Sequence, residues 1–201
     1  MKVDLGGRAV LVVGREGPVV AALVAAVAAN GALVACHDPS RLPADLTAHD
    51  VLIVVHELAA DDKAKEADDL VALTDRIGEA VRERGGRIIV VTTAFGLLPA
   101  RRHGAQSAAT AKTVAAMRLL AMRLGPKVLV NAIGVGALAD GKGGFLSGEA
   151  GMLGHVPAGQ AGAIEDVVAA ALFLADPLNS YLTGQVLQVD GGWAAGYGRN
   201  F

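Results

Sequence analysis

Tyrosine is scarce in this sequence and absent from most of it. The chain has 201 residues and two tyrosines, Tyr181 and Tyr197, both of which lie in its last twenty-one residues. A tyrosine phenol can donate or accept a proton during catalysis, and none stands before residue 181. The sequence therefore excludes tyrosine-based acid/base chemistry from the long region that precedes Tyr181.

Cysteine and excess charge are scarce as well. Cys36 is the single cysteine, which excludes an internal disulfide and suits a reducing compartment. Its place in the apolar run 32–36 predicts a small core residue. The net charge of −2 gives no overall positive field, so we expect no binding to nucleic acid or to an anionic membrane surface.

Long apolar runs are missing too. No stretch of about 18 residues is free of charge or of Gly and Pro punctuation, and the opening MKVDLGGRAV lacks the apolar segment of a signal peptide. We therefore expect a cytoplasmic protein without a membrane segment. The five histidines show no HxxxH spacing, so we expect no metal site.

Hydrophobic residues make up 53% of the chain and fall into short runs and helical repeats. Runs at 8–13 and 32–36 are typical of buried parallel strands, and the apolar residues between them repeat at helical spacing, which makes one βαβ unit. The fold class is therefore α/β, a Rossmann-like doubly wound parallel sheet of about six strands in a single domain, residues 1–201. The remaining predicted strands are 51–55, 87–91, 127–131 and 185–189, and the remaining helices are 61–84, 105–124 and 164–175.

Three stretches of the sequence resemble the short-chain dehydrogenase/reductase family. They are GQAGAIEDVVAAALFLADPLNSYLTGQVLQVDGGWAAGYG (159–198), AVLVVGREG with NGALVACHD (9–38), and LGPKVLVNAIGVG (124–136). The resemblance implies the family strand order 2-1-4-5-6-7 without the third strand. About a dozen residues separate Asp38 from the next strand, too few for the βαβ unit of about 30 residues that the family carries there.

The turn after the first strand departs from the family pattern. The family's TGxxxGxG is replaced by VGREGPVV (13–20), in which Gly14 fits the first glycine, Pro18 falls at the second and Val20 at the third. Proline offers no N–H to a phosphate, and valine places a branched side chain where backbone should approach it. Glu16 adds a negative charge where two phosphates of a dinucleotide would lie.

Asp38 ends the second predicted strand, where family members that prefer NAD carry an acid for the ribose 2′-hydroxyl. It also precedes Pro39, and an aspartate before a proline is an ordinary turn residue, which is the interpretation that we favour. We therefore expect no cofactor-binding residue and no cofactor in this chain, and we expect NAD in a partner subunit.

The family's catalytic tyrosine and lysine are both replaced. Counting back along the predicted helix 105–124 places Gln106 at the tyrosine position and Thr110 at the lysine position, and neither can do that work. Thr93 fits the family's serine position. The resemblance thus implies that this chain has no catalytic residue. A repurposed acid/base set of Thr93, His56 and His103 remains an alternative, because both histidines follow strand ends.

The first hypothesis is that the chain is a non-catalytic pseudo-dehydrogenase subunit and no enzyme on its own. It would assemble with an active short-chain dehydrogenase homologue and stabilise it, as a heterotetramer with two copies of each chain. The complex would carry out NAD-dependent oxidation of an alcohol, for example in an acyl-CoA substrate. Two alternatives remain, an oxidoreductase with a repurposed site and a ligand-sensing regulator.

Residues on the helix 105–124 and in the C-terminal tail are candidates for that subunit contact. Large apolar and aromatic side chains are typical anchors of interfaces, although they can also pack on the core of their own chain. The predicted interface residues are Val114, Met117, Leu120, Trp193, Tyr197 and Phe201.

Overall fold

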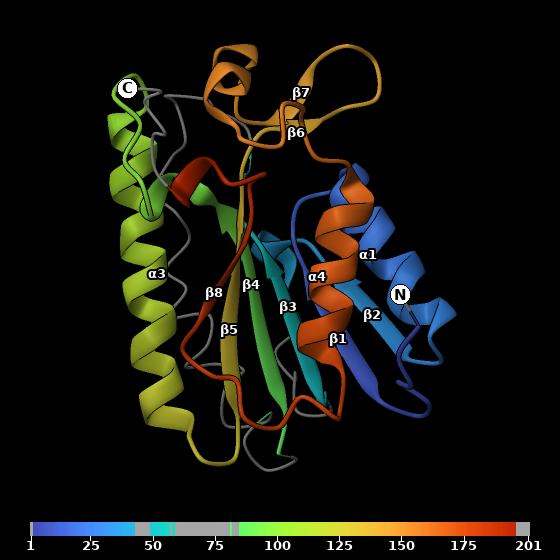
Figure 1. Ribbon diagram of the computed structural model, residues 1–201. Helices are drawn as coiled ribbons and strands as arrows, with labels where there is room; N and C mark the ends of the chain where they lie inside the picture. The colour runs from blue at the N-terminus through green and yellow to red at the C-terminus, as the bar shows by residue number, and fades with distance from the viewer. Residues whose placement is uncertain (1, 43–48, 57, 59–80, 82–84, 196–201) are drawn as a thin grey trace.

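The computed structural model describes residues 2–42, 49–56, 58, 81 and 85–195. Within them, parallel strands form a six-stranded sheet in the order β2-β1-β3-β4-β5-β8 (Figure 1). Each neighbouring pair is parallel, so the carboxyl ends of the strands share one edge of the sheet. The strands are β1 (Ala9–Val13), β2 (Leu33–His37), β3 (Val51–Val55), β4 (Arg87–Thr93), β5 (Leu129–Val135) and β8 (Val186–Val189).

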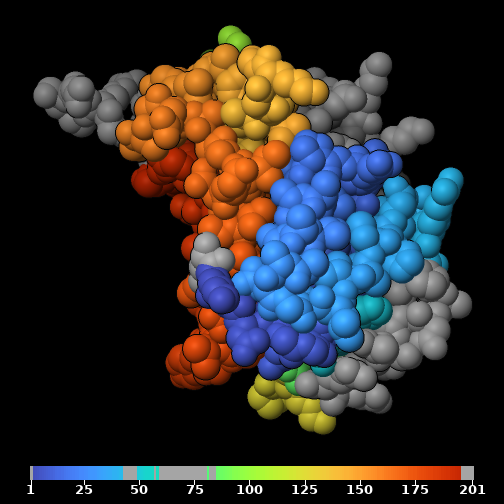
Figure 2. Space-filling view, turned by 90° about the vertical axis from the view of Figure 1, so that its right-hand side faces the viewer, coloured from blue at the N-terminus to red at the C-terminus, as the bar shows by residue number. Residues whose placement is uncertain are grey.

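Helices cover both faces of the sheet. The helices α1 (Pro18–Ala29) and α4 (Ile164–Ala175) lie on one face and α3 (Gly104–Leu124) on the other (Figure 1). Alternate residues of β1 pack under different helices, because successive side chains of a strand point to opposite faces of the sheet. Val10 and Val12 belong to the core under α1 and α4, whereas Leu11 and Val13 belong to the core under α3. From outside, α1 and α4 lie side by side (Figure 2).

Local chemistry explains where these helices begin. Pro18 opens α1, where a missing N–H costs nothing because the first helical N–H groups have no partner inside the helix. In α4 the Asp166 carboxylate accepts a hydrogen bond from the Ala163 N–H at 2.8 Å. Glu165 and Asp166 also place negative charge in the first turn, where the helix dipole favours it.

The α/β class, the six strands and their order confirm the predictions from the sequence. The helices predicted at 105–124 and 164–175 are α3 and α4, while the one predicted at 61–84 lies outside the described residues apart from Val81. A two-stranded hairpin of β6 (Leu138–Ala139) and β7 (Phe145–Ser147) was not predicted. None of the helices in the described ranges is long and apolar enough to span a bilayer.

Candidate functional site at the carboxyl edge of the sheet

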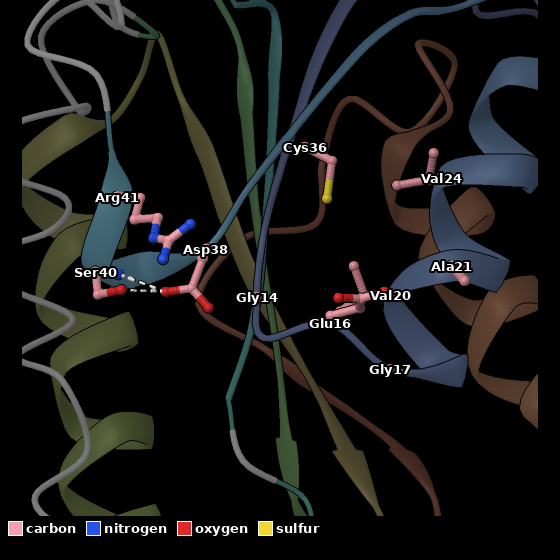
Figure 3. A pocket seen from close by; sticks show the side chains of 10 residues that line it. All are labelled: Gly14, Glu16, Gly17, Val20, Ala21, Val24, Cys36, Asp38, Ser40 and Arg41. Carbon is pink, nitrogen blue, oxygen red and sulfur yellow. Dashed lines mark hydrogen bonds between the residues drawn. The ribbon is translucent and has the colours of Figure 1, made fainter.

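A cavity of about 530 Å³ opens at the carboxyl ends of β1 and β2 (Figure 3). This is the edge at which open α/β sheets bind ligands, and the volume suits a small organic molecule. The walls come from the turn before α1, from the first turns of that helix, and from the end of β2 with the short helix η1 (Pro39–Arg41). The lining residues are Gly14, Glu16, Gly17, Val20, Ala21, Val24, Cys36, Asp38, Ser40 and Arg41.

Asp38 caps η1 and lines the cavity at the same time. Its Oδ1 accepts hydrogen bonds from the Ser40 backbone N–H at 2.8 Å and from the Ser40 hydroxyl at 2.6 Å. The Ser40 hydroxyl is the largest cause that lowers the pKa of Asp38, followed by the Ser40 N–H, with smaller help from the charges of Arg15 and Arg41. The side chain is therefore a turn residue, as favoured above, and also a charged wall of the cavity.

The Gly14 turn is shaped by packing against α1. A Cβ on Gly14 would lie 2.8 Å from Val20 Cγ2 and 3.0 Å from Val55 Cβ, so only glycine fits there. Val20 itself is buried and its side chain lines the cavity next to Gly14. The exposed Glu16 and Pro18 complete the turn. The valine and the acid thus stand at the cavity, where the sequence suggested that they would hinder phosphates.

The prediction that Cys36 is a core residue is wrong. The thiol is exposed and lines the cavity. Cys36 lies beside Val12 in the parallel register, on the face that carries α1, and the cavity between α1 and the edge strand β2 leaves it uncovered. Partial burial raises the pKa of the Cys36 thiol through desolvation. The thiol is therefore kept in its neutral form at pH 7.

The positions of the family's serine and lysine meet inside the protein. Thr93, at the end of β4, and Thr110, on α3, are both buried, and their Oγ1 atoms form a hydrogen bond of 3.0 Å. The segment after β4 can approach α3 this closely because residue 96 is a glycine. A Cβ on Gly96 would lie 2.7 Å from the Thr110 carbonyl carbon. Gln106 is buried one turn earlier on α3. Thr93 and Thr110 are thus brought together, with Gln106 one turn away on α3, and none of the three is an acid or base near neutral pH.

His103 precedes α3 and belongs to a second cluster. Its ring stacks on Phe95, with centroids 5.0 Å apart and an interplanar angle of 12°, and its Nε2 lies 3.8 Å from Oε1 of Glu149. Phe95 also meets Trp193 edge to face at 5.5 Å. The recorded contacts of His103 therefore go to Phe95 and Glu149 rather than to the predicted partners Thr93 and His56.

Sequence reasoning missed Phe95 and Glu149 as parts of this site. Phe95 follows Thr93 by two residues in TTAFG, which is the one local signal that could have pointed to it. His56 follows β3, and its backbone N–H donates to the Val91 carbonyl at 2.9 Å. Glu149 lies in the loop after β7, and no spacing in the sequence relates it to His103.

The predicted interface residues on α3 are taken up by the chain's own core. Val114, Met117 and Leu120 are almost fully buried, the last two in the core against the sheet, and the large apolar side chains that α3 exposes are Leu119 and Met122. Trp193 is buried against Phe95. Tyr197 and Phe201 lie outside the described residues. A contact with a partner subunit stays a prediction, and any part of it on α3 would use other residues of that helix.

Comparisons with known proteins agree on one kind of chemistry. The model of the family described as enoyl-(acyl carrier protein) reductase matches residues 54–194. An uncharacterised oxidoreductase of Mycobacterium tuberculosis is 37% identical over 112 residues, which are 54% of this chain and 43% of that protein. The 3-oxoacyl-(acyl-carrier-protein) reductase FabG of Chlamydia muridarum is 35% identical over 119 residues, 57% of this chain and 47% of that protein. The chain spans about half the length of these curated relatives.

A solved structure extends the similarity to nearly the whole chain. A proposed NAD(P)-dependent gluconate 5-dehydrogenase of Beutenbergia cavernae, with NADP bound at low occupancy, superposes with a TM-score of 0.77 at 25% identity. The match covers 96% of this chain and 99% of that one. The similarity therefore includes the edge of the sheet that holds the cavity.

These comparisons overturn the prediction that the chain is no enzyme on its own. The matching family model is that of a reductase, and the relatives are named as oxidoreductases and reductases, so the findings point to an enzyme. The expectation that the chain carries no cofactor is likewise not supported, because the solved neighbour holds NADP. The chain is similar to these proteins although Gln106 and Thr110 stand at the family's tyrosine and lysine positions.

Proposed function

The chain belongs to the short-chain dehydrogenase/reductase family, and we propose that it is an oxidoreductase of that family with a rebuilt acid/base site. Its reaction is hydride transfer between a nicotinamide dinucleotide and an alcohol or the corresponding ketone. The observation that carries the proposal is the cavity at the carboxyl ends of β1 and β2, with the glycine turn on one side and Asp38 on the other.

The cavity residues fit the adenosine half of such a dinucleotide. Both hydrogen bonds from Ser40 use Oδ1 of Asp38, so Oδ2 can accept a ribose hydroxyl. Ala21 and Val24 offer apolar surface to the adenine, and the start of α1 lines the cavity, where N–H groups without a helical partner would bind a phosphate. When bound, the dinucleotide supplies the hydride donor or acceptor of the reaction.

The charges of the cavity favour NAD over NADP. The carboxylates of Asp38 and Glu16 both line the cavity and would repel a 2′-phosphate, which Arg41 offsets only in part. Pro18 removes one N–H from the start of α1, so we expect a modest affinity for the pyrophosphate. We propose that the chain itself binds NAD(H), in preference to NADP(H).

The single tryptophan makes this proposal directly testable. Trp193 lies at the same edge of the sheet, and its emission overlaps the absorbance of NADH, so bound NADH should quench it by energy transfer. We expect saturable quenching by NADH and weaker quenching by NADPH. Asp38→Ala should weaken NADH binding several-fold, whereas Asp4→Ala, which removes another exposed turn aspartate, should not. If neither nucleotide quenches Trp193 in a saturable manner, the proposal fails.

Assembly with a homologous short-chain dehydrogenase, in a heterotetramer with two copies of each chain, remains part of the proposal. Exposed apolar side chains support it, namely Leu119 and Met122 on α3 and Phe173, Leu178 and Tyr181 at and after the end of α4. Such a pairing resembles the two-subunit 2-(hydroxy(phenyl)methyl)succinyl-CoA dehydrogenase of anaerobic toluene breakdown. Native mass spectrometry of the protein purified from its own host tests it, and a stable homo-oligomer without a second chain would end it.

A further inference from the structure

Four segments of the chain converge on His103 at the carboxyl edge of the sheet. His103 stands before α3, Phe95 belongs to η2 (Ala94–Gly96), Trp193 to η4 (Trp193–Ala195), and Glu149 precedes η3 (Ala150–His155). Trp193 holds Phe95 edge to face, and Phe95 stacks on the imidazole. The plane of the imidazole is thus set by a buried ring whose own position is set by a second ring.

The backbone around His103 is held as firmly as its ring. The His103 N–H donates to the Ala100 carbonyl at 2.9 Å, and the His103 carbonyl accepts from the Ser107 N–H at 2.8 Å, which begins α3. Because backbone and ring are both fixed, the two ring nitrogens have defined surroundings. An imidazole in a solvated loop would have neither constraint.

The two ring nitrogens of His103 differ in their surroundings. Nε2 is buried, makes no hydrogen bond in the described part of the chain, and faces Oε1 of Glu149 at 3.8 Å. A carboxylate on that side favours the tautomer with its proton on Nε2 and leaves the lone pair on Nδ1. The His103 side chain is 14% exposed and that of Glu149 43%, so the pair lies at the boundary with solvent, where a substrate can approach.

His103 also lies close in the chain to the positions at which the family's acid and base are replaced. It precedes Gln106 by three residues, one turn along α3, and Phe95 follows Thr93 by two. Thr93 and Thr110 share one hydrogen bond between their hydroxyl groups, and an aliphatic hydroxyl does not titrate near neutral pH, so neither replaces the lost phenol. A histidine is the side chain whose charge changes most readily near neutral pH, which general acid/base catalysis requires.

We propose that His103 is the catalytic acid/base of this chain and that Glu149 is its positioning residue, an assignment that rests on the function proposed above. A bound dinucleotide would accept the hydride of the carbinol carbon in the oxidation, and Nδ1 of His103 would accept the carbinol proton. In the reduction, the same nitrogen returns the proton to the carbonyl oxygen. Glu149 keeps the other proton on Nε2 and stabilises the imidazolium that forms.

Chemical rescue tests this assignment on the full chain. With NADH and either acetoacetyl-CoA or cyclohexanone as the ketone probe, His103→Ala should lower kcat by about 100-fold or more and leave NADH quenching of Trp193 unchanged. Free imidazole should restore part of the activity, because the shortened side chain leaves room for it against Phe95. His155→Ala, at an exposed histidine of the neighbouring η3, is the matched control and should keep the wild-type kcat.

A second measurement does not depend on turnover. Diethylpyrocarbonate modifies histidines, and mass spectrometry of the peptides locates the product at each one. Bound NADH together with acetoacetyl-CoA should slow the modification of His103 and leave that of His155 unchanged. Glu149→Gln should lower kcat less than His103→Ala does, and imidazole should not restore it, because the histidine is still present.

Several results would overturn the assignment of His103 as the acid/base. It is overturned if His103→Ala keeps the wild-type kcat, if imidazole restores nothing, or if the wild-type protein binds NADH and reduces neither ketone. Equal modification of His103 with and without ligands overturns it as well. Failure of NADH to bind at all refutes the proposed function instead, so the two failures can be told apart.

Discussion

The buried pair of Thr93 and Thr110 offers the sharpest test of the site's packing. Thr110→Val keeps the shape of the side chain but leaves the Thr93 hydroxyl without its partner at 3.0 Å. Both residues are at most 5% exposed, so water does not replace the lost bond. Leaving a buried hydroxyl unsatisfied costs about 1–3 kcal/mol of the free energy of unfolding.

The two single substitutions should not be equivalent. Thr93→Val leaves Thr110 on a helix, where its hydroxyl can bond to a backbone carbonyl one turn earlier, so we expect the smaller loss there. In the double variant both hydroxyls are replaced by methyl groups of the same size, which should be nearly neutral. The stabilities should therefore be non-additive by about 1–3 kcal/mol.

Urea unfolding followed by Trp193 fluorescence measures the free energy of unfolding of the wild type, the two single variants and the double variant. Trp193 is a suitable probe because it is the single tryptophan of the sequence and is buried in the fold. Thr113→Val is the matched control, because the Thr113 hydroxyl donates to the Ala109 carbonyl at 3.3 Å on the same helix and its loss leaves no buried hydroxyl unsatisfied. We expect the control to cost less than about 1 kcal/mol. If the double variant loses the sum of the two single losses, the hydroxyl pair does not exist as described and the reasoning about this site is wrong.

Three further predictions concern the cavity and its support. The hydrogen bonds of Ser40 lower the pKa of Asp38, so the carboxylate stays charged down to a lower pH than an ordinary aspartate. Its contribution to NADH affinity should therefore be constant from pH 8 to pH 5 and be lost only below about pH 4. A fall in affinity between pH 8 and pH 5 that Asp38→Ala removes would contradict this. Glu16→Gln should strengthen NADH binding by about twofold to fivefold at low salt and less at high salt, as measured by Trp193 quenching, since it removes a like charge from the phosphate side. Gly96→Ala should lower the free energy of unfolding by about 1–3 kcal/mol, because the new Cβ would lie 2.7 Å from the Thr110 carbonyl carbon; an unchanged urea midpoint would refute the close approach of η2 to α3.

The strands and helices of this protein could be predicted from short-range patterns. Apolar runs such as 51–55 read as buried strands, and α4 was predicted with the bounds that the structure gives, because periodicity and capping are properties of neighbouring residues. The replacement of the family's tyrosine and lysine could also be seen in the sequence, since it depends on residue identity alone. The assignment of no enzymatic activity was wrong, because a missing acid does not exclude that another side chain takes its place.

The tertiary structure alone decided which side chains meet. Helical spacing identifies Met117 and Leu120 as one apolar face, but only the sheet behind them shows that this face is core and not a subunit contact. Cys36 lies in an apolar run typical of a core strand, yet it is exposed because it lines the cavity between β2 and α1. The contact of His103 with Glu149 joins residues far apart in the chain, and no periodic pattern reports such a distance. The sequence by itself therefore determined the elements and the lost groups, whereas long-range packing determined the cavity and the candidate that replaces the tyrosine.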